Sequence, residues 1–199
     1  MKGLSKTLIL VVIIVIALIA LFIGPYNKMV SKEETCSQAW ANVENAYQRR
    51  ADLIPNLVKA VQGAADFEKK TLEAVINARA KATSVQVDPS NLTEESIAKF
   101  QAAQDELSSA LGRLLVTIER YPELKANQNF LELQSQLEGT ENRISVERNK
   151  YNETVQDYNS YIRKFPNNIV AGVCNFEKKG YFKATEGADK APEVEFNFD

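Results

Sequence analysis

The sequence predicts an all-α protein with one N-terminal transmembrane helix, an elongated antiparallel bundle of three to four long helices, and an irregular, aromatic-rich C-terminal tail. Three observations predict this fold class. An uncharged apolar stretch follows Lys6, and apolar residues then recur at steps of three and four through most of the chain. Glycine and proline are scarce, at 8 and 6 of 199 residues, which favours long helices over a β fold with many turns.

The apolar stretch is long enough to cross a membrane. Residues 7–27 carry no charge, and at about 1.5 Å per residue they span roughly the 30 Å hydrocarbon core of a bilayer. A soluble core helix would keep a polar face, which this stretch lacks. We expect the span to consist of Thr7, Leu8, Ile9, Leu10, Val11, Val12, Ile13, Ile14, Val15, Ile16, Ala17, Leu18, Ile19, Ala20, Leu21, Phe22 and Ile23.

A cleaved signal peptide is the competing interpretation of this stretch. It predicts a shorter apolar run and a small-x-small cleavage site, whereas this run ends in GPYN at residues 24–27. A retained, single-pass anchor is therefore favoured. Lys2 and Lys6 precede the span together with the chain amine, and Lys28 and Lys32 follow it. The positive-inside rule then favours a cytoplasmic N-terminus and a periplasmic or extracellular bundle.

The first bundle helix is expected to bend or break at an elbow around Pro55. Its apolar stripe runs from Cys36 to Val61, and Arg50 fills the one interrupting position. A proline inside a helix frees a backbone carbonyl, which polar neighbours could satisfy. The elbow is either a purely structural break or a partner-docking site made of Asp52, Leu53, Ile54, Pro55, Asn56 and Leu57.

Three further helices complete the expected bundle. Their stripes cover residues 72–80, 97–121 and 130–165, with Asn91 or Thr93 capping the second of the three and Pro166 ending the last. Long amphipathic helices with short connections bury their stripes best as an antiparallel bundle. We therefore expect an anchor at residues 1–27 with its short basic N-terminus, a bundle at 28–166, and a tail at 167–199 that docks aromatic side chains on the bundle.

Composition argues against an active site. The chain has no histidine, the usual general base and the commonest metal ligand, and its two cysteines are too few to hold a metal alone. A net charge of -2 provides no basic field for nucleic acid. We expect no enzyme, no catalytic, cofactor-binding or metal-binding residues, and no small-molecule substrate.

Long stretches of the chain resemble the LemA family. They are YNKMV (26–30), AW (39–40), RRADLIPNLVKAVQG (49–63), EKKTLEAVINARA (68–80), YPELKANQNFLELQSQLEGTENRIS (121–145), YNETVQDYNSYIRKFPNNIVAG (151–172) and YFKA (181–184). The resemblance implies a bacterial inner-membrane or plasma-membrane protein with one N-terminal span, a helical-bundle domain and no catalytic residues to carry over. Cys36, Cys174 and Asn175 depart from the family's pattern.

Two functions fit an anchored bundle without catalytic groups. The first is a non-catalytic scaffold or adaptor for other membrane proteins, in contact with the lipid bilayer through its anchor. The second is a structural protein that forms a homo-oligomer through its heptad seams. Polar residues at Arg50, Gln104 and Arg148 leave the second possible, because polar core positions often set oligomeric state.

Overall fold

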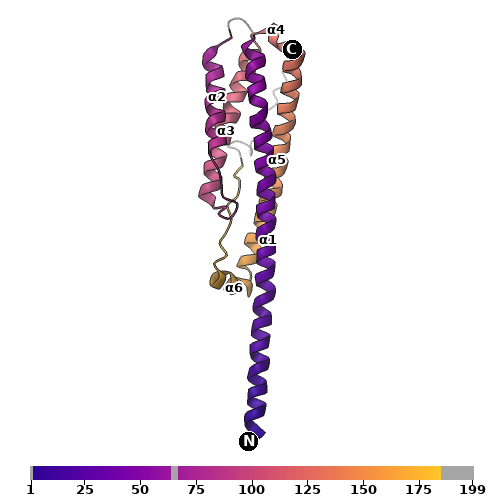
Figure 1. The fold of residues 1–199 in the computed structure, drawn as a ribbon, viewed down its shortest axis with the longest axis vertical. Helices are drawn as coiled ribbons and strands as arrows, with labels where there is room; N and C mark the ends of the chain where they lie inside the picture. Colours follow the sequence, from indigo (N-terminus) through magenta and orange to yellow (C-terminus); the bar gives the residue numbers. More distant parts are fainter. Residues whose placement is uncertain (1, 64–66, 185–199) are drawn as a thin grey trace, which may run out of the picture.

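One very long helix, α1 (Lys2–Gln62), runs the full height of the molecule, and the other elements pack along its C-terminal part (Figure 1). The computed structural model describes residues 2–63 and 67–184, with the side chains of residues 2–7, 15 and 17–21 outside that description. Every regular element in the described residues is a helix, so the all-α prediction is confirmed there. The other helices are α2 (Lys69–Ser84), α3 (Glu94–Ile118), α4 (Pro122–Lys125), α5 (Gln128–Arg163) and α6 (Asn167–Cys174).

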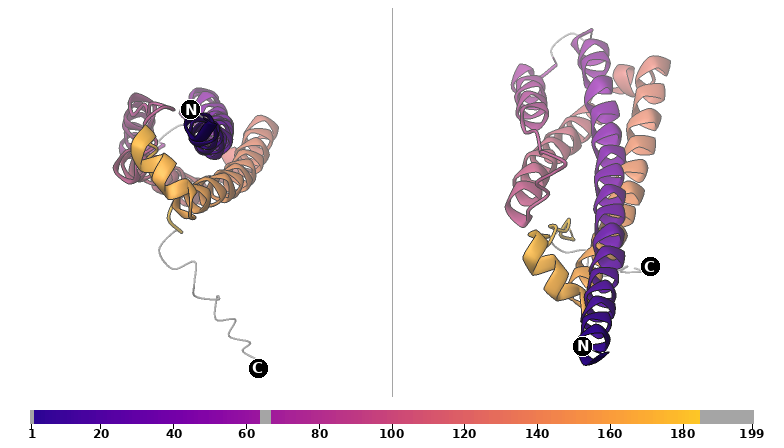
Figure 2. Two further views of the ribbon diagram at one scale, coloured as in Figure 1. Left: turned by 90° about the horizontal axis from the view of Figure 1, so that it is seen from below. Right: turned by 60° about the horizontal axis from the view of Figure 1, so that its bottom comes forward.

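The long helices alternate in direction. α1 and α5 pack against each other along most of the bundle, and α2 and α3 form a second pair beside them (Figures 1 and 2). α4 is a short turn at the end of the bundle far from the N-terminus. α6 packs on α1 and α5 at the opposite end of the bundle, where the N-terminal part of α1 emerges. The first third of α1 extends beyond the bundle as a single helix (Figure 1).

α1 does not break at its internal prolines. Pro25 and Pro55 both lie inside one continuous helix, so the break expected near residues 53–56 is absent. A proline costs a helix one hydrogen bond and crowds the preceding turn. Packing against α5 along the bundle offsets that cost at Pro55, because most helix stability in proteins comes from tertiary packing.

Two apolar clusters fill the bundle. The cluster nearer the N-terminus is centred on Trp40, whose ring lies edge-on to those of Phe100 and Tyr151 and stacks on that of Phe182. The distal cluster joins α1, α2, α3 and α5, and its fully buried leucines, at positions 57, 107 and 114, lie on α1 and α3. In the first cluster, Trp40 of α1 contacts α3 through Phe100, α5 through Tyr151 and the tail through Phe182.

Some stripe positions differ from the expectation. Ile76 is 46% exposed, because α2 buries Ala78 and Ala82 instead. Phe165 lies beyond the end of α5 and is 81% exposed. Thr93 does cap α3, with its hydroxyl accepting a hydrogen bond from the Ser96 amide at 3.2 Å.

The tail begins as a helix, which corrects the expectation of an irregular segment from residue 167. α6 buries Val170 and Ala171, so packing outweighs the weak helix propensity of its two asparagines and Gly172. It ends at Asn175, which takes the left-handed conformation (φ 63°) common at helix C-termini. The departure noted at Asn175 therefore has a structural role.

Beyond α6 the tail is extended and docks on the bundle through its backbone. Asn159 and Asn152 of α5 each bond both the amide and the carbonyl of a tail residue, Lys179 and Phe182 respectively. Tyr151 donates its hydroxyl proton to the Gly180 carbonyl at 3.0 Å. The expected aromatic docking occurs at Phe182, whereas Phe196 and Phe198 lie outside the described residues.

Gly180 is required by a close backbone approach. Its amide donates to the Leu92 carbonyl at 2.8 Å, and a Cβ built there would lie 2.6 Å from the Glu94 Cα. A Gly180→Ala substitution should therefore lower the free energy of unfolding by about 1–3 kcal/mol in denaturant titration, as expected for overpacking.

The matched control is Gly112→Ala in α3, where an added Cβ meets nothing within 4 Å. That change should raise stability by roughly 0.5–1 kcal/mol, because it removes a helical glycine. Equal effects at the two glycines would contradict the close approach at Gly180.

Candidate functional site

The predicted elbow is split between core and surface. Ile54 and Leu57 are buried in the distal cluster, Leu53 and Pro55 are half-buried, and the side chains of residues 52 and 56 are exposed. The exposed part is therefore a narrow polar strip on α1. Its role in partner docking stays a prediction.

The carbonyl freed by Pro55 is bonded by a neighbouring helix. Pro55 has no N–H to offer the carbonyl of Ala51, four residues earlier. Arg79 of α2 donates its Nε proton to that oxygen at 2.7 Å. Asp52, a polar neighbour in the elbow, instead accepts a hydrogen bond from Gln48 at 2.7 Å. Pro55 thus creates an acceptor by which α2 is fixed to α1.

A buried guanidinium separates the two apolar clusters. Arg50 is 1% exposed, and its Nη1 donates to the Glu141 carboxylate at 2.5 Å and to the Ser108 hydroxyl at 2.7 Å. Its Nη2 donates to the side-chain and backbone carbonyls of Gln104, at 2.8 and 3.2 Å. We call Arg50, Gln104, Ser108 and Glu141 the polar layer. It joins α1, α3 and α5 at one height.

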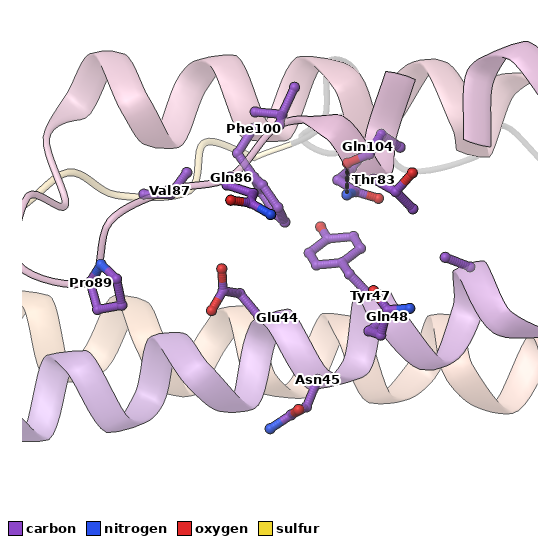
Figure 3. Close-up of a pocket in the computed structure, with 13 residues that line it drawn as sticks. Glu44, Asn45, Tyr47, Gln48, Thr83, Gln86, Val87, Pro89, Phe100 and Gln104 are labelled. Carbon is purple, nitrogen blue, oxygen red and sulfur yellow. Dashed lines mark hydrogen bonds between the residues drawn. The ribbon is translucent and has the colours of Figure 1, made fainter. Parts of the chain in front are cut away.

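An open cleft of about 470 Å³ lies beside the polar layer. Glu44 and Tyr47 point into it from α1, facing Gln86 of the α2–α3 connection and Phe100 and Gln104 of α3 (Figure 3). Burial raises the pKa of the Glu44 carboxyl and that of the Tyr47 hydroxyl. The remaining lining residues are Asn45, Gln48, Ala51, Ala82, Thr83, Val85, Val87 and Pro89.

The cleft holds few groups for chemistry. Glu44 is the one carboxylate in its lining, and Tyr47 is the one other titratable side chain. Among the described residues, no three Cys, Asp or Glu side chains gather as metal ligands. The lining of the cleft is mainly of uncharged polar and apolar side chains, which suits hydrogen bonding.

The two cysteines lie apart from the cleft. Both are free thiols, Cys36 buried and Cys174 half-buried. Burial raises the pKa of the Cys36 thiol.

The N-terminal apolar stretch is helical but is not covered by the bundle. The apolar side chains described between residues 8 and 16 are exposed. Within the described part of the chain, no helix combines the length and the hydropathy needed to cross a bilayer. Of the expected span, the side chains of Thr7, Val15, Ala17, Leu18, Ile19, Ala20 and Leu21 lie outside the described residues.

Sequence reasoning missed several residues of these sites. Arg79 and Ser108 lie beside the apolar stripes of their helices, and neither is distinguished by type or spacing. Glu141 lies on α5, and its ion pair with Arg50 of α1 joins residues that spacing along one helix cannot relate. In α5 the buried charge is Glu147, which Arg143 contacts at 2.9 Å.

Arg79 offers a direct test of the proline-linked contact. Arg79→Ala should destabilise the protein by about 1–3 kcal/mol, because it leaves the Ala51 carbonyl without a partner. In a Pro55→Ala background the restored N–H can bond that carbonyl, so the same change should cost less. Denaturant unfolding of the four variants measures this coupling, and equal losses in both backgrounds would contradict it.

Glu141 tests the polar layer. Glu141→Ala should lower the free energy of unfolding by about 1–3 kcal/mol, because Arg50 stays buried without its counter-charge. Glu138→Ala, one turn earlier on α5 and exposed, should change it by no more than about 0.5 kcal/mol. Urea titration compares the two, and a loss at Glu141 as small as at Glu138 would argue against the layer.

Comparison with known proteins agrees with the sequence motifs. Magnetosome protein MamQ 2 of Paramagnetospirillum magneticum is 26% identical over 199 residues, covering 92% of this chain and 73% of the relative. Magnetosome protein MamQ of Magnetospirillum gryphiswaldense is 25% identical over 195 residues, covering 89% and 72%. Protein LemA of Metamycoplasma hominis is 25% identical over 165 residues, covering 83% and 72%.

The family model gives the assignment. The model described as LemA family matches residues 39–196, which include the cores of the bundle and the polar layer. The resemblance drawn from the motifs is thereby confirmed, and the chain belongs to the LemA family.

Proposed function

We propose that this protein is a single-pass protein of the bacterial inner cell membrane whose bundle is a non-catalytic scaffold or adaptor for other membrane proteins. The observation that carries the proposal is the continuity of α1 from Lys2 to Gln62. The same helix holds the uncharged apolar stretch and the central helix of the bundle, with no linker between them.

A continuous helix holds the bundle in a defined relation to the anchor. At about 1.5 Å per residue, the part of α1 beyond Tyr26 extends roughly 50 Å. α5 and α2 brace this part, through packing and through the Arg79 contact. A partner would therefore meet the bundle surfaces at fixed heights above the membrane, which suits an adaptor.

The bundle offers surface along its length but little reactive chemistry. A shallow groove of about 490 Å³ between α3 and α5 is lined by Leu111, Leu115 and Leu137, with Glu141 at its edge. An apolar floor with a polar rim is typical of protein-binding grooves. Its position away from the first third of α1 leaves it accessible to the outer parts of other membrane proteins.

The oligomer alternative draws less support from the polar positions that suggested it. Arg50 and Gln104 bond each other within one chain, and Arg148 lies over the Phe182 ring at 4.8 Å. Apart from the buried Arg50 Nε, which has no hydrogen-bond partner among the described residues, these contacts are made within one chain.

The anchor can be tested by placing charge in the apolar stretch. Val12→Arg with Ile16→Arg should release the protein from membranes washed with alkaline carbonate, because each buried arginine costs about 2.5–3.5 kcal/mol. Val116→Arg with Val146→Arg, at exposed apolar positions of α3 and α5, is the matched control and should stay membrane-bound. Equal retention of both double variants would contradict the anchor.

The adaptor role is tested on the full-length protein. After gentle crosslinking in cells and extraction in mild detergent, native mass spectrometry should find this chain joined to a second membrane protein. A discrete homo-oligomer would favour the structural alternative. A chain that remains alone after crosslinking at several expression levels would contradict both.

A further inference from the structure

α6 presents apolar side chains on two opposite sides. Its inner side buries Val170 and Ala171 against α1 and α5. On its outer side Ile169 is 54% and Val173 is 71% exposed, and Phe165, four residues before Ile169, is 81% exposed. Spacing of four residues puts Ile169 and Val173 on one face of the helix. The outer face is thus an apolar surface that no described part of the chain covers.

α6 lies where the apolar stretch of α1 leaves the bundle. Met29 is fully buried in the same cluster as Val170 and Ala171, and the Tyr26 ring packs edge-on against Phe176 at 5.6 Å. Viewed from the N-terminal end, α6 lies across the end of the bundle in front of α2 and α3 (Figure 2). The helix is therefore level with the last uncharged residues before Lys28.

Basic residues flank this apolar face. Arg163 and Lys164 precede it and Lys178 follows it, all exposed, with Glu177 the one acid between residues 163 and 178. Lys179 takes no part, because it is buried and paired with Glu33 at 2.7 Å. The exposed charge between residues 163 and 178 is therefore net positive, opposite in sign to that of anionic lipid headgroups.

We propose that the outer face of α6, with Phe165, Ile169 and Val173, lies in the headgroup region of the same bilayer that holds the N-terminal stretch. Amphipathic helices bind at this depth by burying apolar side chains below the phosphates, with lysine and arginine at headgroup level. The inference rests on the proposed anchoring and adds a second point of attachment.

A lipid surface fits these observations better than a protein partner. The exposed face lies at the level where the apolar stretch of α1 leaves the bundle, as the Tyr26–Phe176 contact and the burial of Met29 beside Val170 indicate. Tyr26 lies at the junction, the position that tyrosine favours at membrane interfaces. Two attachments, α1 across the membrane and α6 along it, would also limit the tilt of the bundle.

The test places tryptophan probes on the full-length protein in vesicles of equal parts phosphatidylcholine and phosphatidylglycerol. Val173→Trp reports on α6, and Val116→Trp, also 71% exposed but at the distal end of α3, is the matched control. Ile23→Trp reports on the anchor. Trp40, the one native tryptophan, is fully buried, and its emission is subtracted using the parent protein.

The proposal expects the Val173→Trp emission to shift to shorter wavelength and to lose intensity when lipids spin-labelled near the headgroup are included. The Val116→Trp emission should neither shift nor lose intensity. The Ile23→Trp emission should be quenched by the spin-labelled lipids. Replacing phosphatidylglycerol with phosphatidylcholine should weaken the Val173→Trp shift, because the basic flank then lacks its counter-charge. Thermal unfolding followed by circular dichroism confirms that each variant folds.

Three outcomes would overturn the proposal. If Val173→Trp behaves like Val116→Trp while Ile23→Trp is quenched, the anchor stands and α6 does not touch lipid. If the Val173→Trp probe is shielded from aqueous iodide but unaffected by spin-labelled lipid, protein covers the face. If no probe is quenched, the proposed anchoring itself fails.

Discussion

The unbroken course of α1 is the constraint on which the rest of the structure depends. Every other described helix except α3 and α4 packs its backbone closely against α1, and α3 is joined to it through Phe100 on Trp40 and through the polar layer. Two prolines lie inside this helix without ending it. Pro55 cannot donate a hydrogen bond to the Ala51 carbonyl, and Arg79 of α2 donates one instead, which links α2 to α1.

The polar layer gives the bundle its register. An apolar seam tolerates sliding by one heptad, since leucines and valines are interchangeable partners. Arg50 has four oxygen acceptors on α3 and α5 at one height, and any slip would leave a buried guanidinium unpaired. We infer that the layer exchanges some stability for a single alignment of α1, α3 and α5, a role well attested for buried polar groups in coiled coils.

Periodicity predicted the helical fold because burial of a stripe is a local property of the chain. Trp40, Val43 and Leu57 were placed on the inner face of α1 by spacing alone, and they are fully buried. The partner of Arg50 could not be found in this way, because Glu141 lies 91 residues away. Which residues pair between two helices depends on how far the helices are displaced along each other, and the spacing of apolar residues within one helix does not show this.

The C-terminal region shows the same limit. The interleaving of glycines and a proline with aromatic residues predicts an irregular tail from residue 167. α6 forms there because Val170 and Ala171 pack on elements far away in sequence. The docking of aromatic side chains was expected, whereas the choice of Phe182 depends on side-chain amides of α5 that bond the tail backbone. Long-range contacts, rather than local preference, decide this part of the fold.

The most direct test of the account is the distance across both prolines of α1 in a lipid nanodisc. Spin labels at Gly24 and Lys59, both exposed, can be introduced in a Cys174→Ser background, because Cys36 is buried. At about 1.5 Å per residue, a continuous helix carries the two positions roughly 50 Å apart. One narrow distance near that value is the predicted result. A broad or much shorter distribution would reveal a hinge between the apolar stretch and the bundle, and would contradict a rigidly mounted scaffold.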